Sequence, residues 1–159
     1  MIRIGQGFDV HAFGGRGPLM LGGTTVPCER GLTGHSDADV LLHAITDACL
    51  GAFAKGDIGT WFPPTDEAYR DADSRQLLCS VLQQPFMTPW RLVNLDSTIV
   101  ADSPKIGPYS EQMRITIAGL FQVTRKSVCV KATTCESLGF IGRREGIAAM
   151  AVALFEKSV

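Results

Sequence analysis

Three histidines are the residues best suited to chemistry in this 159-residue chain, and all of them lie within the first 43 positions. His11 follows Asp9 by two residues, and His35 and His43 enclose a stretch with two further aspartates. Two imidazoles and one carboxylate form a good ligand set for zinc or another divalent transition metal. These motifs therefore predict a mononuclear metal site.

A strand must position the first two of these ligands. Residues 1–11 alternate between apolar and polar side chains, which is typical of a strand. Because residues i and i+2 of a strand point to the same face, Asp9 and His11 can reach one ion together.

A helix must position the third ligand. An apolar stripe from Ala38 to Ala52 predicts this helix, with Ser36 as its N-cap and Asp39 in the reciprocal capping position. His43 then completes a set of three protein ligands with a fourth position open. That arrangement is the pattern of a catalytic rather than a structural zinc site.

Each of these residues also has a simpler interpretation. A strand histidine is usually a surface or capping residue, and His35 fits an ordinary loop position. Asp39 and Asp47 fit a solvated helix face, and Asp37 with Asp39 could serve only the helix dipole. Spacing alone favours neither the metal site nor these simpler roles.

The composition predicts one soluble globular domain, residues 1–159, with a sizeable core. Hydrophobic residues make up 45% of the chain and charged residues 19%, and this apolar excess indicates burial between subunits. A net charge of -1 without any run of lysine or arginine argues against nucleic-acid binding. A phosphate-bearing ligand would therefore have to be held by metal ions and backbone amides.

Neither a membrane segment nor a leader is predicted. No apolar stretch is long enough to span a bilayer, and the N-terminus leads directly into a strand. The five cysteines, at positions 28, 49, 79, 129 and 135, include no CxxC pair. They indicate reduced thiols, so a cytoplasmic location is expected.

The pattern along the chain predicts an α/β sandwich of about four strands and four helices, with a mixed sheet covered on one side. The expected strands span 1–11, 92–100 and 128–133, with a hairpin or bulged strand at 19–26, and the expected helices span 36–56, 74–83, 110–121 and 146–157. The last segment is predicted as a helix because it is apolar on most faces. Residues 57–71 are predicted to be irregular.

Three aperiodic segments carry groups that suit phosphate or cation contacts, namely 101–108, 131–136 and 139–146. For segment 101–108 the alternative is a simple turn, and for segment 131–136, taken alone, a plain strand exit is the preferred explanation. The glycine-rich third segment is not a P-loop, so its phosphate signal is weak.

The chain as a whole resembles the 2-C-methyl-D-erythritol 2,4-cyclodiphosphate synthase family. The resemblance runs in order along essentially the entire sequence, and its motifs are Asp9–His11, His35–Asp37, His43–Ala44, Gly56–Gly59, Asp73–Arg75, Lys131–Thr134 and Gly142–Gly146.

The resemblance implies an α/β (α+β) fold with a ferredoxin-like mixed four-stranded sheet and helices on one face. It also implies a homotrimer with active sites between subunits. The implied enzyme is a phosphorus-oxygen lyase of the non-mevalonate isoprenoid pathway. Its substrate would be 4-diphosphocytidyl-2-C-methyl-D-erythritol 2-phosphate, and its products CMP and the cyclic diphosphate.

The resemblance also implies a role for particular residues. Zinc, one per subunit, would be held by Asp9, His11 and His43, and a second ion, Mg²⁺ or Mn²⁺, by Glu136. His35 and Thr134 would stabilise the transition state. The implied substrate contacts include the zinc ligands, His35, Val10 and Ser36. Around the sugar they are Asp57, Ile58, Gly59, Phe62, Pro63, Pro64, Thr65 and Asp66. Around cytosine they are Ala101, Asp102, Ser103, Pro104, Lys105, Ile106 and Gly107. Around the phosphates and the rest of the site they are Thr133, Thr134, Cys135, Glu136, Phe140 and Arg143.

Related enzymes also bring Phe8, Arg143 and Glu145 near a cavity on the trimer axis that can hold prenyl diphosphates.

The sequence departs from the family pattern at three places. Pro64 replaces an aspartate, which puts one sugar contact in doubt. Cys135 replaces a threonine and so lacks a hydroxyl, and Arg144 replaces a glycine and adds positive charge near that cavity.

Two other functions compete with the synthase. A zinc-dependent phosphoester or amide hydrolase would use the open coordination position to activate water, but the chain has no HExxH motif and no second histidine cluster. A non-enzymatic metal-binding or regulatory trimer is the other alternative.

Overall fold

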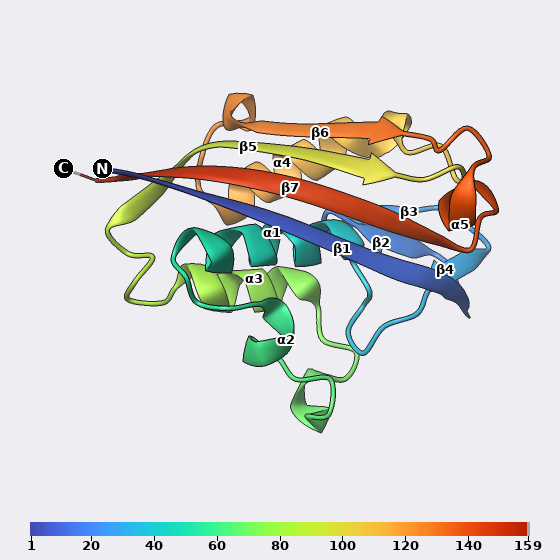
Figure 1. Cartoon of the computed structure of the whole chain (residues 1–159), viewed down its shortest axis with the longest axis horizontal. Coiled ribbons are helices and arrows are strands. Elements are labelled where there is room, and N and C mark those ends of the chain that lie inside the picture. Colours follow the sequence, from blue (N-terminus) through green and yellow to red (C-terminus); the bar gives the residue numbers. More distant parts are fainter. Residues whose placement is uncertain (159) are drawn as a thin grey trace.

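A five-stranded sheet with helices on one face forms the protein, in a computed structural model that describes residues 1–158 (Figure 1). The strand order is β4-β1-β7-β5-β6. The bounds of these strands are Ile2–Arg16 for β1, Arg30–Leu32 for β4, Trp90–Val100 for β5, Val128–Thr133 for β6 and Gly146–Lys157 for β7. Among the strands within residues 1–158, only β5 and β6 pair in parallel, and their connection contains helix α4 (Ser110–Leu120), as parallel crossovers usually do.

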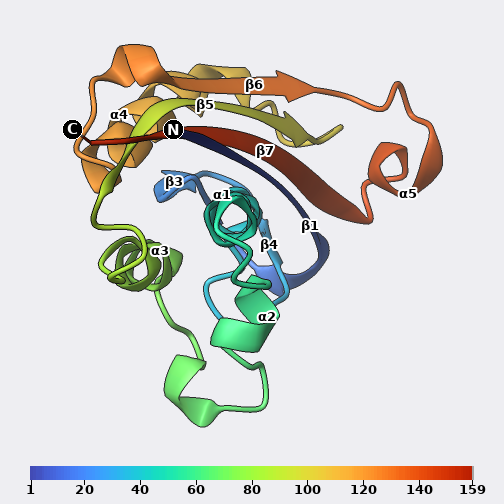
Figure 2. The ribbon, with the colours of Figure 1, turned by 60° about the vertical axis from the view of Figure 1, so that its left-hand side comes forward.

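The remaining elements lie mostly on the helical side of the sheet. A separate ribbon pairs β2 (Leu19–Leu21) with β3 (Thr24–Val26). The helices are α1 (Val40–Ala52), α2 (Ile58–Trp61), α3 (Ser74–Leu82), α4 (Ser110–Leu120) and α5 (Gly139–Gly142), with 3-10 turns at Glu67–Tyr69, Gly107–Tyr109 and Arg125–Ser127. Figure 2 shows α1 nearly end-on beneath β1 and β7, with α2 on its far side. None of the helices in residues 1–158 is long and apolar enough to cross a membrane.

Two glycines let α1 lie directly on β1. A Cβ atom at Gly5 would sit 1.9 Å from the carbonyl oxygen of Ala48, and one at Gly7 would sit 1.9 Å from that of Ala44. Any side chain at these positions would push the helix away from the strand. This close approach brings the first turns of α1 next to residues 9–11 of β1.

The two faces of the sheet differ sharply. On the inner face, side chains such as Leu95, Ile99 and Phe155 pack under the helices and are fully buried. On the outer face, large apolar side chains of β1 and β7 point away from the helices and stay exposed, among them Ile4 at 66% and Phe8 at 51%. The prediction of a mixed sheet covered on one side is therefore confirmed.

The prediction of a final helix is wrong, because residues 146–157 form strand β7. Ala149, Ala151 and Ala153 alternate with the more exposed Met150 and Val152, which is the period of a strand. The strand lies between β1 and β5, and its backbone is paired on both sides. An alanine-rich apolar run satisfies a helix or a buried strand equally well, and pairing on both edges decides for the strand.

The expected helix start and strand count also need correction. Helix α1 begins at Val40, and Asp39 rather than Ser36 is the N-cap, since its carboxylate accepts from the backbone N–H of Leu42 at 3.0 Å. Asp39 is buried, so it does not belong to a solvated face. The main sheet has five strands instead of four because β4 pairs with the extended end of β1. The helices expected at 74–83 and 110–121 and the strands at 92–100 and 128–133 are confirmed within two residues.

Candidate metal centre and active site

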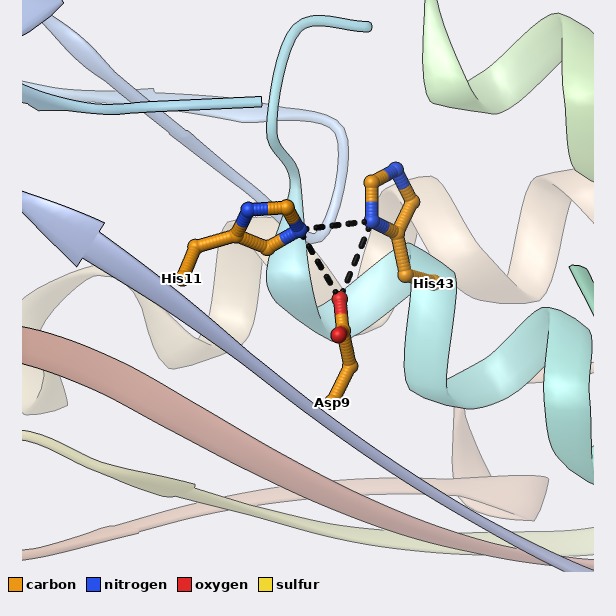
Figure 3. Close-up of side chains that lie close together, drawn as sticks. All are labelled: Asp9, His11 and His43. Carbon is orange, nitrogen blue, oxygen red and sulfur yellow. Dashed lines mark hydrogen bonds and ion pairs between the residues drawn. The ribbon is translucent and has the colours of Figure 1, made fainter. Parts of the chain in front are cut away.

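Asp9, His11 and His43 converge on one point between β1 and α1 (Figure 3). Oδ2 of Asp9 lies 3.0 Å from Nε2 of His11 and 3.0 Å from Nδ1 of His43, and these two nitrogens are themselves 3.0 Å apart. The three ligand atoms thus form a nearly equilateral triangle. The predicted strand dyad and helix histidine come together as the sequence indicates.

Hydrogen bonds on the far side of each ring determine which atoms face the centre. Nδ1 of His11 lies 2.8 Å from the carbonyl oxygen of Thr33, so it carries the proton and Nε2 presents a lone pair. Nε2 of His43 faces the hydroxyls of Ser36 and Ser74 at 3.0 and 2.9 Å, which leaves Nδ1 free for the centre. When both imidazoles are neutral, two nitrogen lone pairs and a carboxylate oxygen point at one another with no proton between them. Such a set repels itself unless a cation sits inside it, so these residues fit a divalent metal.

The electrostatics of the triad agree with this assignment. Burial alone would raise the pKa of Asp9, but the hydrogen bonds and charges of the two imidazoles outweigh it and hold that pKa well below its usual range. Burial also works against a charged His11, yet Asp9 raises the pKa of His11 above its ordinary value. Each side chain thus favours the charged state of its neighbour, and a metal ion can supply the positive charge in place of a proton.

A cavity of about 320 Å³ opens over the triad. The three metal ligands line this cavity. Its other lining residues are His35, Ser36, Ile58, Gly59, Phe62, Pro64, Tyr69 and Leu77. His35 is oriented by the backbone oxygen of Asp66, 2.9 Å from its Nε2. Asp57 caps α2 through the N–H of Thr60, so this carboxylate begins the helix that brings Ile58 and Gly59 to the cavity.

Asp47, on α1, holds the start of α2 in place. Its Oδ1 accepts from the backbone N–H of Ile58 at 2.7 Å. Burial raises the pKa of Asp47, and the carboxylates of Asp57 and Asp9 add to that rise. The residue thus anchors α2 and is not part of a solvated face.

A second cavity, of about 350 Å³, lies at the carboxyl ends of β5 and β6. It is lined by Ala101, Asp102, Pro104, Lys105, Ile106, Gly107, Pro108, Ala132, Thr133 and Thr134. The carboxylate of Asp102 accepts from the backbone N–H groups of Cys135 and Ser137 at 2.8 and 3.0 Å. Glu136 is exposed beside it and accepts from the hydroxyl of Thr134 at 2.5 Å.

One chain does not bring these two cavities together. They share no lining residue. Helix α2, which lines the first cavity, lies below the sheet in both views, whereas β6, which lines the second, is the strand at the top of the sheet (Figures 1 and 2). Val10 lies apart from both, because its side chain is on the outer face of the sheet. Arg143 and Phe140 are exposed at α5, where Arg143 pairs with Glu145 at 2.8 Å.

Sequence reasoning missed several residues that support or line the first cavity. Ser74 and Asp37 hold His43 from behind, and Tyr69 and Leu77 line the cavity wall. Ser74 lies 31 residues from His43, so no local spacing reveals the contact. The family motifs His35–Asp37 and Asp73–Arg75 contain both residues, and the helix predicted from Ser74 marks the element, but none of these signals identifies a partner of His43.

The fold and the site define an α/β protein with an Asp-His-His metal-binding centre. A family model described as the YgbB family matches residues 2–156, and the chain belongs to this family. It is 58% identical over 158 residues to the 2-C-methyl-D-erythritol 2,4-cyclodiphosphate synthase of Geobacillus kaustophilus, covering 99% of this chain and all of the relative. The resemblance predicted from the sequence is therefore confirmed.

Solved structures agree with this membership. The IspF–CDP complex of Plasmodium falciparum has a TM-score of 0.86 at 30% identity and covers 99% of this chain and 97% of its own. The bifunctional IspDF of Campylobacter jejuni has a TM-score of 0.94 at 41% identity, but this chain spans only 42% of that longer protein.

Proposed function

We propose that the protein is a cyclodiphosphate synthase that converts 4-diphosphocytidyl-2-C-methyl-D-erythritol 2-phosphate to 2-C-methyl-D-erythritol 2,4-cyclodiphosphate and CMP in the non-mevalonate isoprenoid pathway. An oxygen of the 2-phosphate attacks the β-phosphorus, and the bond from that phosphorus to the CMP oxygen breaks. The reaction balances without water. The observation that carries it is the Asp9–His11–His43 triangle in a chain 58% identical to a synthase of this name.

Two cations would complete the phosphate site. Asp9, His11 and His43 fit zinc, and Glu136 would hold Mg²⁺ or Mn²⁺. Bound cations supply charge neutralisation and alignment, which phosphoryl transfer needs more than a strong base. His35, in the wall of the first cavity, and Thr134, in the second, would donate hydrogen bonds to phosphate oxygens.

The separation of the two cavities supports an active site shared between copies of the chain. The cavity at the metal triad is lined by four of the predicted sugar-binding residues, Ile58, Gly59, Phe62 and Pro64. The cavity at the ends of β5 and β6 is lined by the predicted cytosine loop, Ala101 to Gly107, apart from Ser103. A substrate that joins a sugar to a nucleotide needs both. We infer that the second cavity of one subunit faces the first cavity of its neighbour, and that three subunits close into a ring.

The outer face of the sheet supports the same assembly. Six of the exposed large hydrophobic residues lie on this face of two adjacent strands, namely Ile2, Ile4, Phe8 and Val10 of β1 with Met150 and Val152 of β7. A contiguous apolar patch of this kind marks a protein contact, and a second copy of the chain is the partner that the divided site requires. The apolar excess expected to be buried between subunits thus lies on a sheet face rather than on a final helix.

A ring built on this face would leave the patch around a central axis. Arg143 and Glu145 lie just before β7, at the end of the patch near Phe8 and Val10. Arginine side chains there could bind a diphosphate, and the apolar side chains could contact a prenyl chain. We therefore propose an axial site for a prenyl diphosphate.

The five cysteines are free thiols, which fits an enzyme of a reducing cytoplasm.

One assay tests the reaction. Phosphorus NMR of the substrate with the protein, zinc and Mg²⁺ should show CMP and a cyclic diphosphate in equal amounts. Running it in ¹⁸O-labelled water separates the synthase from a hydrolase, because only a hydrolase incorporates solvent oxygen into its product. A product carrying ¹⁸O, or no turnover in the fully loaded protein, would refute the proposal.

A further inference from the structure

His43 is held from behind by a chain of hydrogen bonds that ends in a carboxylate. Its Nε2 lies 2.9 Å from the hydroxyl oxygen of Ser74, which in turn lies 2.5 Å from Oδ1 of Asp37. His43 and Ser74 are buried, 8% and 1% exposed, so water competes little for these bonds. An ionised carboxylate can only accept, so Ser74 donates to Asp37 and its oxygen accepts from the Nε2–H of His43.

The carboxylate at the end of this chain is itself fixed. Oδ2 of Asp37 accepts from the backbone N–H of Ser74 at 3.1 Å, and Oδ1 accepts from that of Asp39 at 3.2 Å. The backbone N–H of Asp37 also donates to the carbonyl oxygen of Ala72 at 3.0 Å. The segment before α1 is thereby joined to the start of α3, and the serine hydroxyl has one defined direction.

The two histidines of the centre are supported by different means. His11 donates to a backbone carbonyl of Thr33, which no side-chain substitution removes. His43 depends on side chains, and of its two serine neighbours only Ser74 is bonded to a carboxylate. Ser36 accepts from a backbone N–H at 3.4 Å and lines the cavity, so its own proton is free to point toward a substrate.

We propose that Asp37 and Ser74 are positioning residues that hold the proton of His43 on Nε2 and so present Nδ1 to the metal. Neither residue belongs to the metal triad or lines the first cavity. If this relay, the hydrogen-bond chain through Ser74 and Asp37, is broken, Ser36 remains as a second acceptor for the same proton. The His43 ring then keeps one hydrogen bond but is less firmly oriented. This inference rests on the metal centre of the proposed function and not on the reaction itself.

The direct test is imidazole ¹⁵N NMR of the full-length, zinc-loaded protein. We expect the His43 signals to show a protonated Nε2 and a zinc-bound Nδ1. Coordination through Nε2, or a proton on Nδ1, would overturn the proposal without any variant. This measurement also detects the tautomer itself, which a merely structural role for Ser74 would not fix.

Zinc affinity, measured by competition with a chelator, tests the relay by substitution. Ser74→Ala and Asp37→Asn should each raise the zinc dissociation constant by about 10–100-fold, the usual cost of losing a partner behind a ligand. The double variant should be no worse than the stronger single one, because both changes break the same chain. Ser74→Thr keeps the hydroxyl and should restore most of the affinity.

Ser80→Ala is the matched control. Ser80 lies on the same helix, and its hydroxyl donates to the carbonyl oxygen of Leu77 at 2.7 Å, away from the centre. The zinc affinity of the Ser80→Ala protein should equal that of the wild type. Folded Ser74→Ala and Asp37→Asn proteins with wild-type zinc affinity would overturn the proposal. A protein with the expected His43 tautomer and no CMP release would instead refute only the synthase function.

Discussion

The two cavities differ in how completely one chain builds them. In the first, three ligand atoms already point at one another, and each imidazole is bonded on its far side to Thr33 or Ser74. In the second, Thr134 and Glu136 are exposed and bond mainly to each other. The metal-holding half is thus preorganised. The second cavity presents exposed groups that a nucleotide and a facing subunit would engage under the proposed function. Predictions that separate the two halves are therefore the most informative.

The largest effect should come from the preorganised half. His43→Ala or Asp9→Asn should lose the bound zinc and lower kcat/KM by about 100-fold or more, since removing the cation costs several kcal/mol of transition-state stabilisation. Circular dichroism should show that the fold persists. His35→Ala is the matched histidine control, and it should keep zinc while losing turnover. Near wild-type activity of His43→Ala in metal-depleted buffer would remove the metal centre from the mechanism.

A charge on the outer face should disable the site without touching either cavity. Met150→Lys places an ammonium in the proposed interface, where an unpaired buried charge costs about 3–5 kcal/mol. We expect a monomer by analytical ultracentrifugation, with zinc still bound and turnover lost. Ile115→Lys is the control, because Ile115 is as exposed as Met150, 46% against 43%, but lies on α4. An active Met150→Lys monomer would show that one chain suffices.

A moderate effect should come from the open half. Glu136→Gln should leave zinc affinity unchanged and raise the Mg²⁺ or Mn²⁺ concentration needed for half-maximal activity by about 10-fold, since a neutral amide is a poorer ligand for a hard cation. Substrate affinity should weaken with it. An unchanged requirement for the second cation would mean that Glu136 is not its ligand.

The difference between the two halves also explains what the sequence could predict. Asp9 and His11 share a strand face by the two-residue period, and His43 lies on a helix with a clear apolar stripe, so local rules could suggest the triad. Spacing alone did not decide between a metal site and simpler roles. Asp37 and Ser74 meet across 37 positions through the packing of α3 beside α1, and no local pattern encodes that contact. The N-cap was displaced for a similar reason. Asp39 also accepts from the backbone N–H groups of Gly22 and Gly23, and this long-range contact fixes where α1 begins.

The failure at the last element has a different cause. Residues 146–157 are apolar on both faces, because one face of β7 is covered by helices and the other carries the exposed patch. A strand with two apolar faces loses the alternation that identifies strands. The expected apolar excess therefore lies on a strand face and not on a helix, and its burial between subunits stays a prediction.

The smallest predicted effect concerns the axis of the proposed trimer. Geranyl or farnesyl diphosphate should raise the melting temperature, because a ligand that binds only the assembled native state stabilises it by about 2.7 kcal/mol at 100 times its dissociation constant. For a chain of this size that corresponds to about 2–4 °C for each kcal/mol. Arg143→Ala should abolish the shift by removing a donor to the diphosphate.

Arg125→Ala is the matched control for this shift. Arg125 is as exposed as Arg143, 64% against 61%, and is likewise paired with a glutamate, but it lies after α4. Its variant should keep the full thermal shift. A trimer that responds to no prenyl diphosphate would discard the axial site alone. A monomer at micromolar concentration would discard the shared active site as well, because the second cavity would then have no partner surface to face.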